Sequence, residues 1–194
     1  GYLISLAMGV PPTRFTVTAP ALSAWTMVLV LALGIGCAVV SILFCQGLHR
    51  TERLAEKYLK NPWLRAVVGG CIVIALTKLV GTGDYNGAGM DVIERAVAGE
   101  ASGWAWVLKL LFTAVTIGFG FKGGEVVPSF FVGATFGCVA GSLLGLPPGF
   151  AAAVGLVAVF CGAVNCPVAS IVLAVELFGS GGVVYFAVAC DISY

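Results

Sequence analysis

The segment GGEVVPSFFVG at residues 123–133 contains the side chains with the clearest capacity for chemistry. Glu125 follows two glycines, and no charged residue occurs from Val126 through Val175. An ionisable side chain at the start of so long an apolar tract is costly in lipid, and such residues usually serve transport. Desolvation favours the neutral carboxyl group over the ionised one. We therefore expect Glu125 to carry protons.

The backbone around Glu125 predicts that a helix begins here, inside the membrane. The two glycines interrupt a preceding helix, and Pro128 suits the first turn of a new one, where a missing N–H group costs nothing. The amides of Val126 and Val127 would then be free to donate hydrogen bonds, with the positive end of the helix dipole beside them. This arrangement predicts a site for an anion.

Two other interpretations of Glu125 are possible. It could be a structural carboxylate that pairs with Lys122, three residues earlier. It could also be the general base of an intramembrane enzyme, but the sequence has neither an HExxH motif nor a Ser/Lys or paired-Asp arrangement. The 7 cysteines lie singly among apolar residues, and His49 is the only histidine. We therefore expect no enzymatic activity, no metal site and no cofactor.

The composition indicates a protein that crosses the lipid bilayer several times. The chain is 60% hydrophobic and only 10% charged, with a mean hydropathy of +1.07. A soluble domain of this length could not bury so much apolar surface. The formal net charge of +1 argues against a nucleic-acid partner. We expect a multi-pass protein of the cell membrane, with the bacterial inner membrane as its location.

The hydrophobic segments predict an all-α protein with helices of unequal length. Residues 21–46 are long enough to span, and basic residues 49–65 suggest that its helix continues beyond the cytoplasmic face. A return helix over 63–80, a short amphipathic helix over 90–98 and an apolar helix over 104–119 follow. After Glu125 the apolar segments are short and interrupted by glycine and proline. They are residues 128–144, 150–164 and 168–178.

Broken helices of this kind are typical of transporters with re-entrant elements. Gly133, Gly137 and Gly141 recur at four-residue spacing, which predicts close packing against another helix. Residues 1–10 make up about half of a membrane span, and residues 182–194 begin a helix that stops before it could cross. We therefore expect the chain to be part of a larger protein.

The order of these segments resembles the C-terminal half of the CLC family of chloride channels and anion/proton antiporters, over nearly the whole chain. The resemblance rests on short motifs in a fixed order. They are Leu48-His49-Arg50, Asn61-Pro62-Trp63, the glycine-rich turn at 81–89, Gly124-Glu125-Val126-Val127-Pro128 at the GxFxP anion-binding turn, and Asn165-Cys166-Pro167 followed by residues 171–177. The resemblance implies that residues 1–194 are one half of an inverted-repeat transporter.

Glu125 makes the site similar to that of the fluoride/proton antiporter branch, because most chloride-handling members have an apolar residue after this glycine. The resemblance implies a halide site formed by Gly124, Glu125, Val126 and Val127, with the ring edge of Phe131 facing the ion. Some members of that branch have a threonine where this chain has Val127, which would alter a proton relay. The alternative within the family is a chloride/proton antiporter or a chloride channel.

The resemblance also implies partners for this chain. They are the halide and protons, the missing N-terminal half, which carries a gating glutamate, and a second copy in a homodimer. An anion-binding tyrosine would lie beyond Tyr194. Without these parts we expect the fragment itself not to transport.

Overall fold

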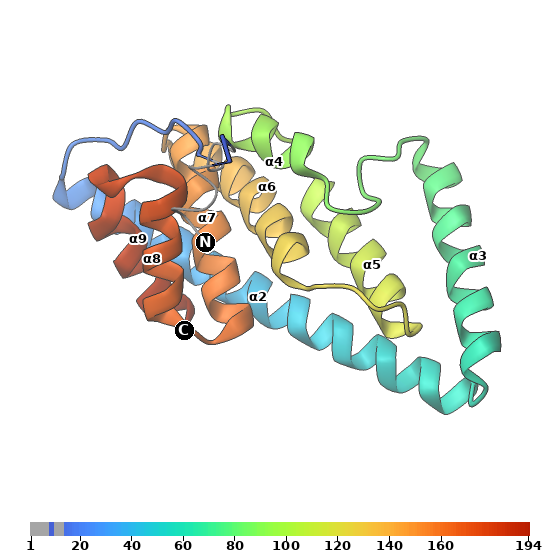
Figure 1. The fold of residues 1–194 in the computed structure, drawn as a ribbon. Helices are drawn as coiled ribbons and strands as arrows, with labels where there is room; N and C mark the ends of the chain where they lie inside the picture. Colours follow the sequence, from blue (N-terminus) through green and yellow to red (C-terminus); the bar gives the residue numbers. More distant parts are fainter. Residues whose placement is uncertain (1–7, 10–13) are drawn as a thin grey trace.

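The computed structural model describes residues 8–9 and 14–194, and these residues form helices and connecting loops without a β-strand (Figure 1). This confirms the predicted all-α class. The predicted half-span at residues 1–10 falls mainly outside the described residues. The helices are α2 (Ala24–Tyr58), α3 (Pro62–Val80), α4 (Met90–Val97), α5 (Ala105–Gly118), α6 (Val126–Leu144), α7 (Pro148–Val164), α8 (Pro167–Phe178), the 3₁₀ turn η1 (Ser180–Gly182) and α9 (Val183–Ser193).

Helix α2 is a single continuous helix of 35 residues, so the predicted span and its basic extension are one element. It begins where the Ser23 side chain accepts a hydrogen bond from the amide of Trp25 at 3.3 Å. A helix of this length extends about 50 Å, which exceeds the ~30 Å hydrocarbon core. Its last turns, which carry Arg50, Arg53 and Lys57, therefore extend beyond the span.

Helix α3 returns along the opposite direction after a short turn. It begins at Pro62, with the Asn61 side chain accepting a hydrogen bond from the amide of Trp63 at 3.0 Å. It ends at Val80 and is capped by Gly81, which lies in the left-handed region with φ +77°. By length and apolar composition, three of the described helices could cross a membrane, namely α2, α3 and α6. Helices α5, α7, α8 and α9 are apolar but shorter.

Helices α6 and α7 form the centre of the fold. All residues from Phe150 through Val159 are buried, so α7 is covered on every side. The predicted glycine stripe of α6 does pack against a neighbour. A side-chain carbon at Gly133 would meet the carbonyl oxygen of Gly155, and one at Gly137 would meet that of Ala151. The two backbones therefore touch where no side chain intervenes.

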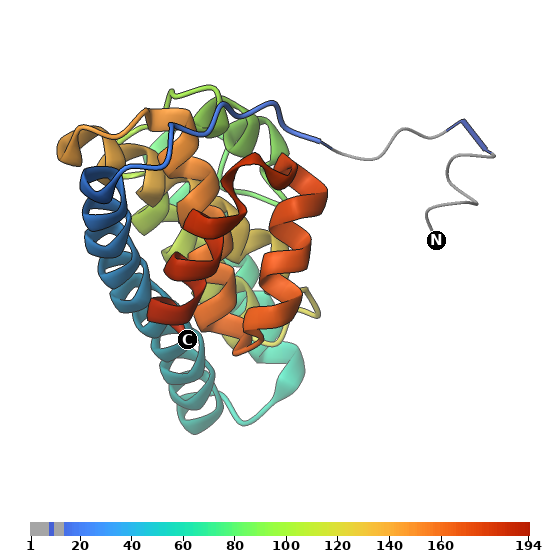
Figure 2. The ribbon, with the colours of Figure 1, turned by 90° about the vertical axis from the view of Figure 1, so that its left-hand side faces the viewer.

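The break between α7 and α8 lies at the predicted Asn165-Cys166-Pro167. Asn165 has φ +60° and ends α7 in the left-handed region, and Pro167 begins α8. The chain then turns through η1 into α9. Figure 2 shows α8 and α9 side by side, with α9 packed along α2. The short, interrupted helices predicted after Glu125 are thus confirmed.

Asn165 provides a test of this break. Asn165→Val should destabilise the protein by about 1–2 kcal/mol, because a β-branched residue is strained at this φ. Asn165→Gly removes the side chain without that strain and should leave stability nearly unchanged. Thermal unfolding of the whole protein in detergent measures both. Equal stability of the two variants would contradict the left-handed geometry.

Candidate anion site at the start of α6

Helix α6 begins at Val126, directly after a linker of residues 119–125 that has no regular structure. Glu125 occupies the N-cap position with φ −89° and ψ −13°, and its side chain makes no capping hydrogen bond. The first backbone bond of the helix joins the amide of Ser129 to the carbonyl oxygen of Glu125 at 3.0 Å. The helix start predicted at this segment is therefore confirmed.

The first turn of α6 presents two unused backbone donors. Neither the amide of Val126 nor that of Val127 donates a hydrogen bond to another group in the part of the chain that the structure describes. Pro128, the third residue of the helix, has no N–H group. The hydroxyl of Ser129 donates to the carbonyl of Val126 at 2.6 Å and so steadies the turn. The unpaired amides and the helix dipole make this end attractive to an anion.

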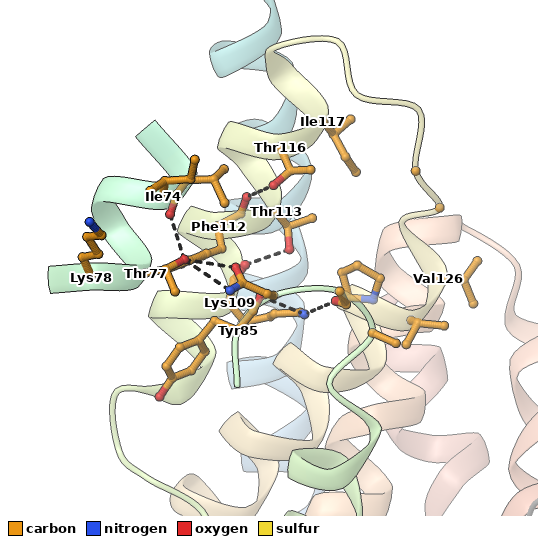
Figure 3. A pocket seen from close by; sticks show the side chains of 18 residues that line it. Ile74, Thr77, Lys78, Tyr85, Lys109, Phe112, Thr113, Thr116, Ile117 and Val126 are labelled. Carbon is orange, nitrogen blue, oxygen red and sulfur yellow. Dashed lines mark hydrogen bonds between the residues drawn. The ribbon is translucent and has the colours of Figure 1, made fainter. Parts of the chain in front are cut away.

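A cavity of about 810 Å³ lies against this helix start (Figure 3). Its wall is formed by α3, the loop of residues 81–89, α5, the linker and the first turn of α6. Gly124, Val126 and Val127 all line it. The structure therefore brings three of the predicted anion-site residues to one cavity.

The polar side chains of α5 do not compete with these amides as donors. Thr113 and Thr116 line the cavity, but each hydroxyl donates to a carbonyl of its own helix, to Lys109 and Phe112 respectively, at 2.7 Å. A hydroxyl that donates in this way offers only its lone pairs to the cavity. These two hydroxyls are therefore not the donors for an anion in the cavity.

Glu125 does not line this cavity, although the residues on both sides of it do. It is exposed, and its side chain makes no capping hydrogen bond. No ion pair joins Glu125 to Lys122 within residues 14–194. This geometry gives no support to the structural alternative for Glu125.

Phe131, whose ring edge was predicted to face a halide, lies in the packed core of the structure. Its side chain is 0% exposed and does not line the cavity. The ring packs against the ring of Tyr85, with centroids 6.1 Å apart, and a side-chain carbon at Gly89 would lie 2.7 Å from it. In this structure the ring serves packing, and its contact with an ion stays a prediction.

Lys109 is a cavity residue that the sequence reasoning missed. It lies in α5, is only 1% exposed, and donates hydrogen bonds to backbone carbonyls of the loop at 81–89. The sequence does distinguish this residue, because Lys109 is the only charged residue between Glu100 and Lys122. An ionisable residue inside an apolar tract is usually functional, and this holds for Lys109 as it does for Glu125.

A helical membrane protein with a broken helix aimed at an anion-attracting cavity belongs to the class of ion transporters and channels. The family model described as "Voltage gated chloride channel" matches residues 1–194. The chain therefore belongs to this family of chloride channels and anion/proton antiporters, as the resemblance implied.

Similar proteins include both fluoride and chloride transporters. The chain is 37% identical over 176 residues to the "Chloride/fluoride channel protein" of Pseudomonas syringae pv. tomato, covering 88% of this chain and 39% of that protein. It is 29% identical over 177 residues to an H(+)/Cl(-) exchange transporter of Vibrio cholerae, covering 82% of this chain and 36% of that one.

The fold is also that of a solved transporter. It matches the crystal structure of a CLC-type fluoride/proton antiporter with a TM-score of 0.94 at 29% identity, covering 99% of this chain and 49% of the antiporter chain. The chain thus spans about half the length of that structure and less than half of the curated relatives that it matches.

Proposed function

We propose that the complete protein exports fluoride in exchange for protons, with the halide bound at the start of α6 and Glu125 as the proton carrier. The observation that carries this proposal is the pair of unpaired amides at Val126 and Val127, two residues that line the cavity and directly follow the exposed Glu125. The likeness to a CLC-type fluoride/proton antiporter and to a chloride/fluoride channel protein supports it.

Fluoride is small and strongly hydrated, so its site must replace water with good hydrogen-bond donors. Unpaired amides at a helix start are such donors, and the helix dipole adds partial positive charge. A hydrogen bond to a charged group contributes about 1.5–3 kcal/mol. Two such bonds from Val126 and Val127, next to Gly124, would bind the ion without covalent attachment.

Glu125 couples the halide to a proton. The ionised carboxylate would repel an anion bound next to it, whereas the neutral carboxyl group would not. We propose that Glu125 takes up a proton when the halide moves one way and releases it when the halide moves the other, which gives exchange of the two ions. No covalent step is involved, and we propose no enzymatic activity, cofactor or metal.

The remaining parts of the transporter are proposed to lie outside these residues. We propose that residues 1–194 form the C-terminal half of an inverted-repeat domain, since they cover 49% of the antiporter chain. The N-terminal half and a second copy of the protein would complete the functional homodimer. The assembly would lie in the inner membrane of a bacterium, and the fragment alone would not transport.

The second candidate is chloride/proton exchange or passive chloride conduction by the same site. The 29% identity to an H(+)/Cl(-) exchange transporter favours it. The amide donors would serve either halide, and Glu125 is the feature that favours fluoride.

Flux measurements on the full-length protein in liposomes test the proposal. Vesicles loaded with fluoride should release it and take up protons, whereas chloride-loaded vesicles should do so more slowly. Faster chloride release would favour the second candidate, and halide release without proton uptake would indicate a channel.

Removing one amide donor tests the halide site itself. Val127→Pro deletes the N–H group within the first turn, where Pro128 already shows that proline is accepted. The half-saturating fluoride concentration should rise about tenfold or more, as expected for the loss of a hydrogen bond to an ion. Val127→Ala keeps the amide and should behave as wild type. A Val127→Pro protein with unchanged half-saturation would exclude this amide from the site.

A further inference from the structure

Lys109 carries a buried ammonium group. Within the described residues its hydrogen-bond partners are backbone carbonyls and not carboxylates. Its ammonium donates to the carbonyl oxygen of Gly87 at 2.6 Å and to that of Tyr85 at 3.2 Å (Figure 3). No ion pair involves it within residues 14–194. Burying an ammonium without a counter-charge is costly, and it persists only where other groups compensate. The two carbonyl oxygens provide part of that compensation.

The face of Phe131 provides another part. The ammonium of Lys109 lies 4.8 Å from the centroid of this ring, within the range of a cation–π interaction. An ammonium has three N–H donors, and two are used by the loop carbonyls. Lys109 therefore joins three elements at one point: α5, the loop of residues 81–89 and α6.

The loop depends on this contact for its position. Residues 81–89 have no regular structure, and Gly81, Gly87 and Gly89 all have positive φ. Its other side-chain interactions lie at or near the surface. Asn86 donates a hydrogen bond to Thr77 at 3.2 Å, and Asp84 forms a salt bridge with Arg95 at 3.1 Å. Exposed pairs of this kind contribute little to stability. The buried ammonium is the stronger attachment.

Phe131 transmits that position to the anion site. It lies four residues, about one helical turn, after Val127, so both side chains are on the same face of α6. The ring is enclosed by Lys109, Tyr85 and Gly89. Its position fixes the rotation of the first turns of α6, and with it the direction of the unpaired amides.

We propose that Lys109 is a positioning residue for the halide site, because it clamps the loop of residues 81–89 and the ring of Phe131 against each other and so orients the first turn of α6. This inference rests on the function proposed above. Lys109 does not touch the ion; it acts through Phe131 and the loop.

The test compares two lysines that line the same cavity. Lys109→Met keeps the apolar stem and removes the ammonium, whereas Lys78→Met removes an exposed charge from the cavity wall. In the full-length protein, Lys109→Met should raise the half-saturating fluoride concentration about tenfold, change the maximal rate less, and speed hydrogen exchange at residues 81–89. Lys78→Met should change none of these.

Several results would overturn the inference. A folded Lys109→Met protein with wild-type half-saturation would overturn the inference, and so would an equal effect of Lys78→Met, because that effect would come from charge in the cavity alone. If Lys109→Met does not fold, Phe131→Leu removes the ring but keeps an apolar side chain. It should raise half-saturation in the same way, and an unchanged value would overturn the inference. A wild-type protein that moves no halide refutes the proposed function instead, and the exchange rates still test the clamp.

Discussion

Glu125→Gln should abolish proton movement by the full-length protein. Glutamine keeps the shape and polarity of the side chain but cannot take up and release a proton at neutral pH. In fluoride-loaded liposomes, proton uptake should fall to the level of vesicles without protein. Halide release should then be uncoupled from the proton gradient. Parallel recordings from a fluoride electrode and a pH electrode measure both fluxes.

Glu176→Gln is the matched control for this prediction. Glu176 lies in α8 and is also an exposed carboxylate, so the same substitution changes the same chemical group at another place. It should retain coupled transport. Proton uptake that persists in Glu125→Gln would show that another group carries the proton.

Gly155→Val should prevent the protein from folding. A side-chain carbon at Gly155 would meet the carbonyl oxygen of Gly133 and lie 2.7 Å from the Cα of Gly137. These atoms belong to the backbone of α6 and cannot rotate away, so the two helices must separate. Overpacking a core costs about 1–3 kcal/mol even where side chains can adjust, and here the cost should exceed that. Gel filtration in detergent should show aggregated protein in place of a defined peak.

Gly103→Val is the control, because no atom lies within 4 Å of a side-chain carbon built at Gly103. It should give a normal elution profile. A well-folded Gly155→Val protein would mean that α6 and α7 do not approach each other as closely as described.

The helices could be predicted because their boundaries depend on local signals. Asn61 and Pro62 begin α3, and Asn165 and Pro167 separate α7 from α8, as residues with these backbone preferences do in many proteins. The glycine spacing of α6 likewise predicted close packing, although only the structure shows that α7 is the partner.

The site was predicted only in part, because its geometry depends on contacts between distant segments. The start of α6 and the free amides follow from local sequence, and the structure has both. The burial of Phe131 depends on Tyr85 and Gly89, about forty residues earlier, and no local pattern signals it. Lys109 could have been found, since a single lysine in an apolar helix is itself a signal.

The most direct test of the halide site is the response of two backbone amides to fluoride. Amide proton chemical shifts of Val126 and Val127 can be recorded by solid-state nuclear magnetic resonance in the full-length protein in bilayers, with and without fluoride. Both protons should move downfield when fluoride binds, since each would donate a hydrogen bond to the ion. Saturating fluoride that leaves both shifts unchanged, while transport proceeds, would contradict the account.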